Sequence, residues 1–164
     1  TDTELIVHLY EEHGEDVFSE LKGQFALALI DFKKQTIFLA RDRVGIAPLH
    51  WMRHGDWVYF GSEIKAIMAS GEVPAVTDPR GLDHVFTFFA MSNRRTMFEG
   101  VNALLPGHYL RIAFRPDGKP AEIVERLSAP VVRTVGRIRK ALALNNRCLA
   151  GDQKFAVAFK KELA

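Results

Sequence analysis

A threonine at position 1 and a cysteine at position 148 are the residues of this sequence best suited to nucleophilic attack. An N-terminal threonine can attack a carbonyl group with its own α-amine as base, and a cysteine thiolate can do so beside a positioned base. Cys148 lies in a basic stretch, residues 145–148, which favours the thiolate. Since no base is suggested near it, we expect an incidental cysteine, whereas the pattern alone leaves Thr1 open.

A second candidate is the segment RDRVGIAPL, residues 41–49, which combines charged residues with a glycine and a proline. Such a turn is tightly specified, and Asp42 can accept hydrogen bonds from Arg41, Arg43 or backbone N–H groups. We expect a structural turn held by an ion pair. An anion-binding loop is the alternative, which a single glycine supports only weakly.

The six histidines do not have the spacing of metal ligands. His8 and His13 lie five positions apart, and His50 and His54 lie four apart across an expected strand and turn. No cysteine or carboxylate cluster joins them in the sequence, so we expect no metal site. Ser62 lacks the glycines of a nucleophile elbow and is expected to cap a helix.

Two hydrophobic periods alternate along the chain and indicate the elements that must position these residues. A helical stripe follows Asp2 or Thr3 as cap and is interrupted near Gly14, and another helix is expected to open at Pro79. Apolar runs around turn residues predict antiparallel hairpins at 24–30 with 36–41, 48–53 with 57–61, and 108–114 with 121–124, and a short helix at 62–70. Because no βα repeat is present, the sequence predicts a layered α+β domain, mostly antiparallel sheet with flanking helices.

Charge divides the chain near Glu125. Residues 1–125 hold 13 Lys and Arg against 18 Asp and Glu, whereas residues 126–164 hold 9 against 2. We therefore expect one domain over 1–125 and a separate basic tail over 126–164. Within the tail, residues 130–144 have the apolar spacing of a helix.

The composition fits one soluble globular domain, since 48% of the 164 residues are hydrophobic and 26% are charged. No apolar run reaches the roughly 20 residues of a membrane helix, and the acidic start does not resemble a signal peptide. One cysteine cannot form an internal disulfide, so the cytoplasm is the expected compartment. The start at Thr1 suggests a processed chain or a fragment of something longer.

Four segments of the chain share their order and spacing with one known family. They are TDTELIVHLYEEHG, LKGQFALALIDFKKQTIFLARDRVGIAPLHW, YFGSEIKAIMASG and RTMFEGVNALLPGHYLRI. They resemble the glutaminase domain of glutamine-hydrolysing asparagine synthetases and related class II amidotransferases, over about Thr1 to Ile112. The resemblance implies a four-layer αββα sandwich of the N-terminal-nucleophile hydrolase type, of which this chain would hold part.

The resemblance also implies a mechanism for the parent enzyme. An amino-terminal cysteine attacks the side-chain amide of glutamine with its own α-amine as base, and an Asn side chain and a Gly N–H stabilise the oxyanion. The released ammonia passes to a synthetase domain, where ATP and Mg²⁺ activate aspartate or a related carboxylate. No cofactor is implied for this chain itself.

Few residues of that machinery match positions of this chain. Asp2 matches the acidic residue that holds the α-amino group of glutamine, and a helix N-cap is its alternative role. Thr1 matches a neighbour of that site and not a nucleophile, so we expect no catalytic residue here. Structural or interdomain roles are implied, through RDRxGxxPL and SExKA, for Arg41, Asp42, Gly45, Pro48, Ser62, Glu63 and Lys65.

The nucleophile and the oxyanion pair precede the matched region in the family, and the tail 126–164 does not match it. We therefore expect a truncated or frame-shifted product that is inactive alone, with glutamine and the missing parts of the parent enzyme as partners. One alternative is a non-catalytic module that docks on another subunit, or as a homodimer, through exposed strand edges. The other is nucleic-acid binding by the tail, against which a solvated basic face is the expected explanation.

Overall fold

The computed structural model describes residues 2–89, 91 and 94–128. Its helices are α1 (Asp2–His13), η1 (Gly14–Asp16), α2 (Val17–Glu20), α3 (Ile64–Met68) and α4 (Pro79–Phe88). Its strands are β1 (Ala26–Asp31), β2 (Thr36–Arg41), β3 (His50–His54), β4 (Trp57–Gly61), β5 (Asn102–Ala103), β6 (His108–Phe114) and β7 (Pro120–Leu127). Residues 129–164 lie outside the described part, so the helix expected in the tail stays a prediction.

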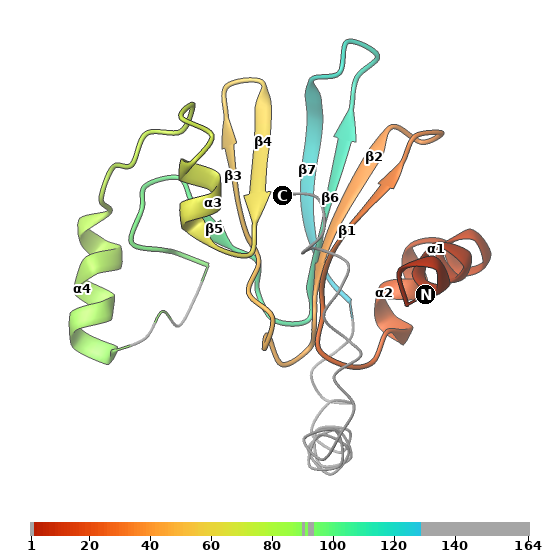
Figure 1. Ribbon diagram of the computed structural model, residues 1–164, viewed down its shortest axis with the longest axis horizontal. Helices are drawn as coiled ribbons and strands as arrows, with labels where there is room; N and C mark the ends of the chain where they lie inside the picture. The colour runs from red at the N-terminus through yellow and green to blue at the C-terminus, as the bar shows by residue number, and fades with distance from the viewer. Residues whose placement is uncertain (1, 90, 92–93, 129–164) are drawn as a thin grey trace.

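The described strands form two antiparallel sheets, one with the order β1-β2-β6-β7 and one with the order β4-β3-β5. Figure 1 shows α1 and α2 against the four-stranded sheet, and α3 and α4 on the side of the three-stranded sheet. The layers therefore follow the order αββα. This confirms the predicted fold class, an α+β domain with mostly antiparallel sheet and flanking helices.

Three apolar clusters hold the layers together. Between the helices α1 and α2 and their sheet lie Tyr10, Val17, Phe18, Leu27, Leu29, Phe38, Ala40 and Tyr109. Between the two sheets lie Leu39, Leu49, Leu104, Leu110 and Ile112, and on the side of α3 lie Met52, Ile67, Val73 and Val101. Since successive strand residues point to opposite faces, β2 and β6 each contribute to the first two clusters.

Local sequence signals explain most element boundaries. α1 ends where Gly14 adopts a φ of +59°, a conformation that costs glycine little. The Asp78 carboxylate accepts hydrogen bonds from the N–H groups of Arg80 and Gly81, with Pro79 as the first helical residue of α4. The expected hairpins and the expected opening of α4 are confirmed.

The expected cap of α3 is wrong. The residue before the helix is Glu63, in an extended conformation with φ −120° and ψ 140°, and no side chain caps the first turn. Ser62 instead lies one residue too early, where its backbone carbonyl accepts a hydrogen bond from His50 Nδ1 (3.0 Å). The serine–glutamate pair resembles a cap in sequence, but the cross-strand contact fixes Ser62 outside the helix.

The strand β7 extends past the expected charge boundary. Arg126 pairs with Tyr109 and Leu127 pairs with His108 in the antiparallel ladder between β6 and β7. The first two residues of the basic segment 126–164 are therefore part of the four-stranded sheet. Among the helices of the described residues, none has the length and apolarity needed to cross a bilayer.

Candidate functional site

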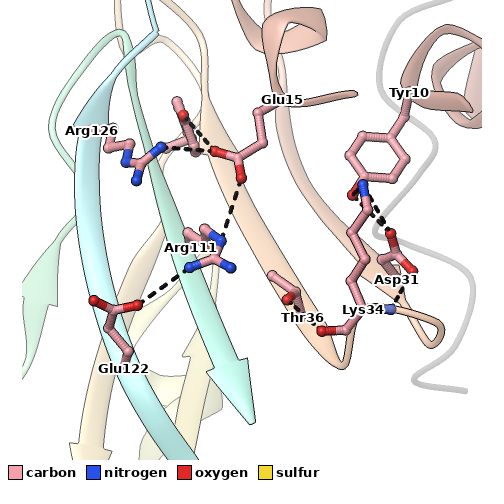
Figure 2. Close-up of polar contacts among 9 residues, drawn as sticks. Tyr10, Glu15, Asp31, Lys34, Thr36, Arg111, Glu122 and Arg126 are labelled. Atoms are coloured by element: carbon pink, nitrogen blue, oxygen red, sulfur yellow. Dashed lines mark hydrogen bonds and ion pairs between the residues drawn. The ribbon is translucent and has the colours of Figure 1, made fainter. Parts of the chain in front are cut away.

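The helix α1 begins at Asp2, and its position relative to the sheet is set by the middle of the helix. The Tyr10 hydroxyl donates a hydrogen bond to the Asp31 carboxylate (2.9 Å), at the end of β1. The same carboxylate accepts the Lys34 backbone N–H (2.9 Å), and the Lys34 ammonium lies 5.1 Å from the centre of the Tyr10 ring. Figure 2 shows these side chains converging at the β1–β2 turn. The side chain of Asp2 itself lies outside the described part.

A second polar cluster lies just after the C-terminal end of α1 and fixes that end of the helix. The carboxylate of Glu15, in the 3-10 turn after Gly14, accepts hydrogen bonds from the Tyr109 hydroxyl (2.9 Å) and from Arg126 Nη1 (3.1 Å). It also forms an ion pair with Arg111 Nε (3.3 Å). Three side chains from β6 and β7 therefore meet one carboxylate from the helical layer, and Figure 2 shows Arg111 and Arg126 pointing toward Glu15. We call Glu15, Tyr109, Arg111 and Arg126 the Glu15 cluster.

These contacts shift the ionisation of the groups involved. Burial raises the pKa of the Tyr10 hydroxyl, and its hydrogen bond to Asp31 raises it further. The backbone N–H of Lys34 lowers the pKa of the Asp31 carboxyl, and the Tyr10 hydroxyl adds to this shift. Burial also raises the pKa of Tyr109. At neutral pH the cluster around Tyr10 therefore consists of a neutral phenol, a carboxylate and an ammonium, which are mutually compatible.

The loop 41–49 folds around the carboxylate of Asp42. Its Oδ1 accepts the backbone N–H groups of Val44 (3.0 Å), Gly45 (2.7 Å) and Ile46 (3.1 Å), and its Oδ2 accepts that of Ala47 (3.0 Å). The residue is 1% exposed. Four backbone N–H groups thus satisfy the buried carboxylate, so backbone donors, one of the alternatives that the sequence left open, hold this turn. The loop is held as a turn around an internal anion.

The guanidinium of Arg41 closes the same loop from the other side. Its Nε donates to the carbonyl of Ala47 (2.8 Å), Nη1 to that of Leu104 (2.7 Å) and Nη2 to that of Gly45 (2.7 Å). Gly45 has a φ of +73°, and a Cβ on it would lie 2.7 Å from Cγ of Pro106. This loop therefore ties the end of β2 to the segment that precedes β6. Pro48 lies in the same loop, just before β3.

The SExKA segment lies next to that loop through His50. The His50 ring, the first residue of β3, contacts the Ser62 carbonyl, and burial lowers the pKa of the imidazole, with the Arg41 charge acting in the same direction. Glu63 and Lys65 form an exposed ion pair (2.6 Å) at the start of α3. The structure thus places Arg41, Asp42 and Gly45 in one loop. A contact with His50, at the start of the strand that follows this loop, brings Ser62 next to it.

Two adjoining clefts of about 390 Å³ and 360 Å³ lie at the start of α4. They share Asp78, Arg95 and Gly100 in their linings. Asp78 is occupied by its role as helix cap and by an ion pair with Arg95 (2.5 Å). Burial alone would raise the pKa of Asp78, but the hydrogen bonds from Arg95 and the helix N–H groups lower it. Asp78 and Arg95 therefore hold the start of α4, whereas Arg94, in the second cleft, pairs with Glu125 of β7 (3.0 Å).

The sequence did not indicate the contacts that hold α1. The helical stripe and the strand at 108–114 that the sequence predicts give no partner for Tyr10, Glu15 or Tyr109. Their partners are 21 and 94 positions away in the chain, beyond any local pattern. A tyrosine in an apolar helical stripe is the one available signal, because its hydroxyl needs a partner when the ring is buried.

The sequence of this chain matches a known protein family and is similar to several known proteins. Residues 1–119 match the family described as "Glutamine amidotransferase domain". The chain is 39% identical over 119 residues to asparagine synthetase [glutamine-hydrolyzing] 3 of Bacillus subtilis, covering 72% of this chain and 19% of the relative. It is 34% identical over 110 residues to amidase chry2 of Gibberella zeae, covering 67% and 16%. The chain spans less than a fifth of the length of these relatives.

Proposed function

Because the chain belongs to the glutamine amidotransferase domain family, we propose that it forms part of the glutamine-hydrolysing domain of an asparagine synthetase-type enzyme. The observation that carries the proposal is the family match over residues 1–119. The enzyme would release ammonia from the side chain of glutamine and transfer it to an activated carboxylate. The αββα layers and the relatives named asparagine synthetase support this assignment.

Within that enzyme, we propose that the Asp2 carboxylate binds the α-ammonium group of glutamine. A carboxylate makes a strong charge-assisted hydrogen bond to an ammonium group. The contacts of Tyr10 and Glu15 support this role, because they fix both the middle and the end of the helix that begins at Asp2. The loop 41–49 and the segment with Ser62, Glu63 and Lys65 would act as scaffold and as the face toward the rest of the enzyme.

The step that breaks the amide bond would use a nucleophile outside residues 1–164. In the proposed mechanism an N-terminal cysteine supplies the thiol and its α-amine supplies the base. A polypeptide of residues 1–164 alone is then expected to be inactive toward glutamine. Detectable hydrolysis that survives Cys148→Ala would contradict this assignment.

The remaining features of the proposal concern partners and compartment. ATP and Mg²⁺ would act in a synthetase domain, where they activate aspartate, and not in the described residues. A carboxylate related to aspartate is the alternative acceptor. We expect the enzyme to act in the cytoplasm, in keeping with a single cysteine.

A chimera tests this function. Residues 1–119 replace the matched segment of the Bacillus subtilis relative, and amide formation is measured with glutamine and, separately, with ammonium chloride. Since added ammonia bypasses glutamine hydrolysis, the ammonia reaction reports whether the other domain is intact. We expect both reactions in the chimera. A chimera that uses ammonia at the rate of the parent but does not use glutamine would contradict the proposed function.

A further inference from the structure

Arg43 joins the loop 41–49 to the helical layer. Its backbone follows the buried Asp42, and its Nη2 donates a hydrogen bond to the carbonyl of Ser19 in α2. The last carbonyls of a helix have no partner within the helix, and a cationic side chain is a favourable donor to them. Close to this contact along the chain, the backbone N–H of Asp42 donates to the carbonyl of Phe25 (2.9 Å). Two hydrogen bonds from the loop therefore hold α2 and the segment that follows it.

The segment after α2 packs into the same apolar cluster as the helix that begins at Asp2. Four partly buried side chains from these two parts contact that cluster, Ile6 and Leu9 of α1 and Leu21 and Phe25 of the segment. Figure 1 shows α1 and α2 in one layer, on the same side of the four-stranded sheet. Ile6 lies about one helical turn after Asp2. Because packed side chains transmit displacements, a shift of the segment reaches the first turns of α1.

The loop presents an apolar face on its other side. Val44 and Ile46 are 52% and 51% exposed. Their backbone N–H groups donate to the Asp42 carboxylate (3.0 and 3.1 Å), which holds both residues to the same anchor. The N–H of Gly107 donates to the Asp42 carbonyl (2.9 Å) and fixes the backbone just before Arg43. The loop is therefore one unit, with two apolar side chains exposed and one arginine bound to α2.

The two arginines beside Asp42 have different tasks. Arg41 donates to three carbonyls, two of them within its own loop, so its loss would disrupt the loop itself. Arg43 instead reaches a carbonyl 24 positions earlier in the chain. Substitution of Arg43 removes this link and leaves the four N–H donors of the Asp42 carboxylate in place.

We propose that Arg43 is a positioning residue, through which contact at Val44 and Ile46 and binding of glutamine at Asp2 influence each other. The inference rests on the proposed function, in which this loop faces the rest of the enzyme and Asp2 binds glutamine. A displacement of the loop moves α2 through the guanidinium, and the packed helical layer follows. Because coupling between two binding sites is reciprocal, substrates bound in the rest of the enzyme then alter the affinity for glutamine.

Hydrogen exchange of the full-length chain tests the link itself. Arg43→Gln should accelerate exchange of the α1 and α2 amides about tenfold, because a hydrogen bond from a charged donor is lost. Exchange in β3 and β4 should stay unchanged. Arg53→Gln is the matched control, since Arg53 is exposed and donates to the nearby Gly55 carbonyl (3.3 Å). Unchanged exchange in α1 and α2 of Arg43→Gln, or equal acceleration throughout the chain, would overturn the proposal whether or not the proposed function holds.

Kinetics of the chimera test the consequence for glutamine. The KM for glutamine is measured from glutamate release, with and without ATP and aspartate. These substrates should change the KM by about fivefold or more in the unsubstituted chimera and by less than about twofold with Arg43→Gln. Arg43→Lys should restore the change, because an ammonium group can donate to the same carbonyl, and Arg53→Gln should keep it. The ammonia reaction should keep the same rate in all variants.

The outcomes separate this inference from the proposed function. An equal change of KM with and without Arg43→Gln, or no change in the unsubstituted chimera, would overturn the inference alone. Loss of all glutamine hydrolysis in both Arg43→Gln and Arg43→Lys would also overturn it, since the residue would then be needed for the fold. An unsubstituted chimera that does not use glutamine would contradict the proposed function and the inference with it.

Discussion

The carboxylate of Glu15 accepts a hydrogen bond of 2.9 Å from the hydroxyl of Tyr109, which lies 94 positions later in the chain. This contact joins the end of the helical layer to β6, and Arg111 and Arg126 add their charges to it. The helix that starts at Asp2 is therefore fixed at its far end by a cluster from two strands. Rotation of α1 about its axis would break all three contacts.

Glu15→Ala should lower the free energy of unfolding by about 1–2 kcal/mol, because it removes the acceptor of the Tyr109 hydroxyl and of Arg126, and one of the two carboxylates that pair with Arg111. Denaturant unfolding measures the change. Glu11→Ala is the matched control, since Glu11 is in α1 and its side-chain contact within the described residues is an exposed one with His8 (3.4 Å). Equal effects of the two substitutions would contradict the role given to the Glu15 cluster.

Asp42→Ala should cost about 3–4 kcal/mol, since it removes a buried carboxylate and leaves four backbone N–H groups of the loop 41–49 without their acceptor. Asp117→Ala is the control. Its carboxylate accepts one N–H, from Lys119 (3.1 Å), in an exposed turn, and its loss should cost at most about 1 kcal/mol. A loss at Asp42 as small as that at Asp117 would show that the loop does not depend on the internal carboxylate.

Gly45→Ala separates steric contact from backbone strain when it is compared with Gly55→Ala. Both glycines have positive φ, +73° and +58°, so both substitutions carry the strain of the left-handed region. A Cβ at Gly45 would also lie 2.7 Å from Pro106, whereas one at Gly55 meets nothing within 4 Å. We expect Gly45→Ala to be more destabilising by about 1–3 kcal/mol in thermal or denaturant unfolding. Equal losses would rule out the tight contact with Pro106.

The Asp31 carboxylate should make stability depend on acid. Its pKa in the folded state lies below the ordinary value of 3.8, because Lys34 N–H and the Tyr10 hydroxyl bind the charged form. The stabilisation is therefore complete above the ordinary value and is lost as pH falls through the lowered pKa. Asp31→Asn should flatten the decline of unfolding free energy as the pH falls below the ordinary value of 3.8. An unchanged decline in Asp31→Asn would contradict the assignment.

The hairpins and the start of α4 could be predicted because their signals are local. The turn residues after Ile30, and the Asp78–Pro79 pair, act within a few positions of the structure they determine. The assignment of strands to sheets could not be predicted, since β2 pairs with β6 across a long intervening segment. The partners of Tyr10 and Glu15 could not be predicted for the same reason, because they too are distant in the sequence. Ser62 failed as a cap because a contact with β3 overrides the local signal.

The central claim is that this chain supplies the carboxylate that holds glutamine, on a helix fixed by the Tyr10 and Glu15 contacts. The most direct measurement is the KM for glutamine of the chimera with and without Asp2→Asn, with the ammonia reaction measured in parallel. Loss of a charge-assisted hydrogen bond predicts a KM about tenfold or more higher. The ammonia reaction should stay unchanged. An unaltered KM for glutamine in the Asp2→Asn chimera would contradict the account.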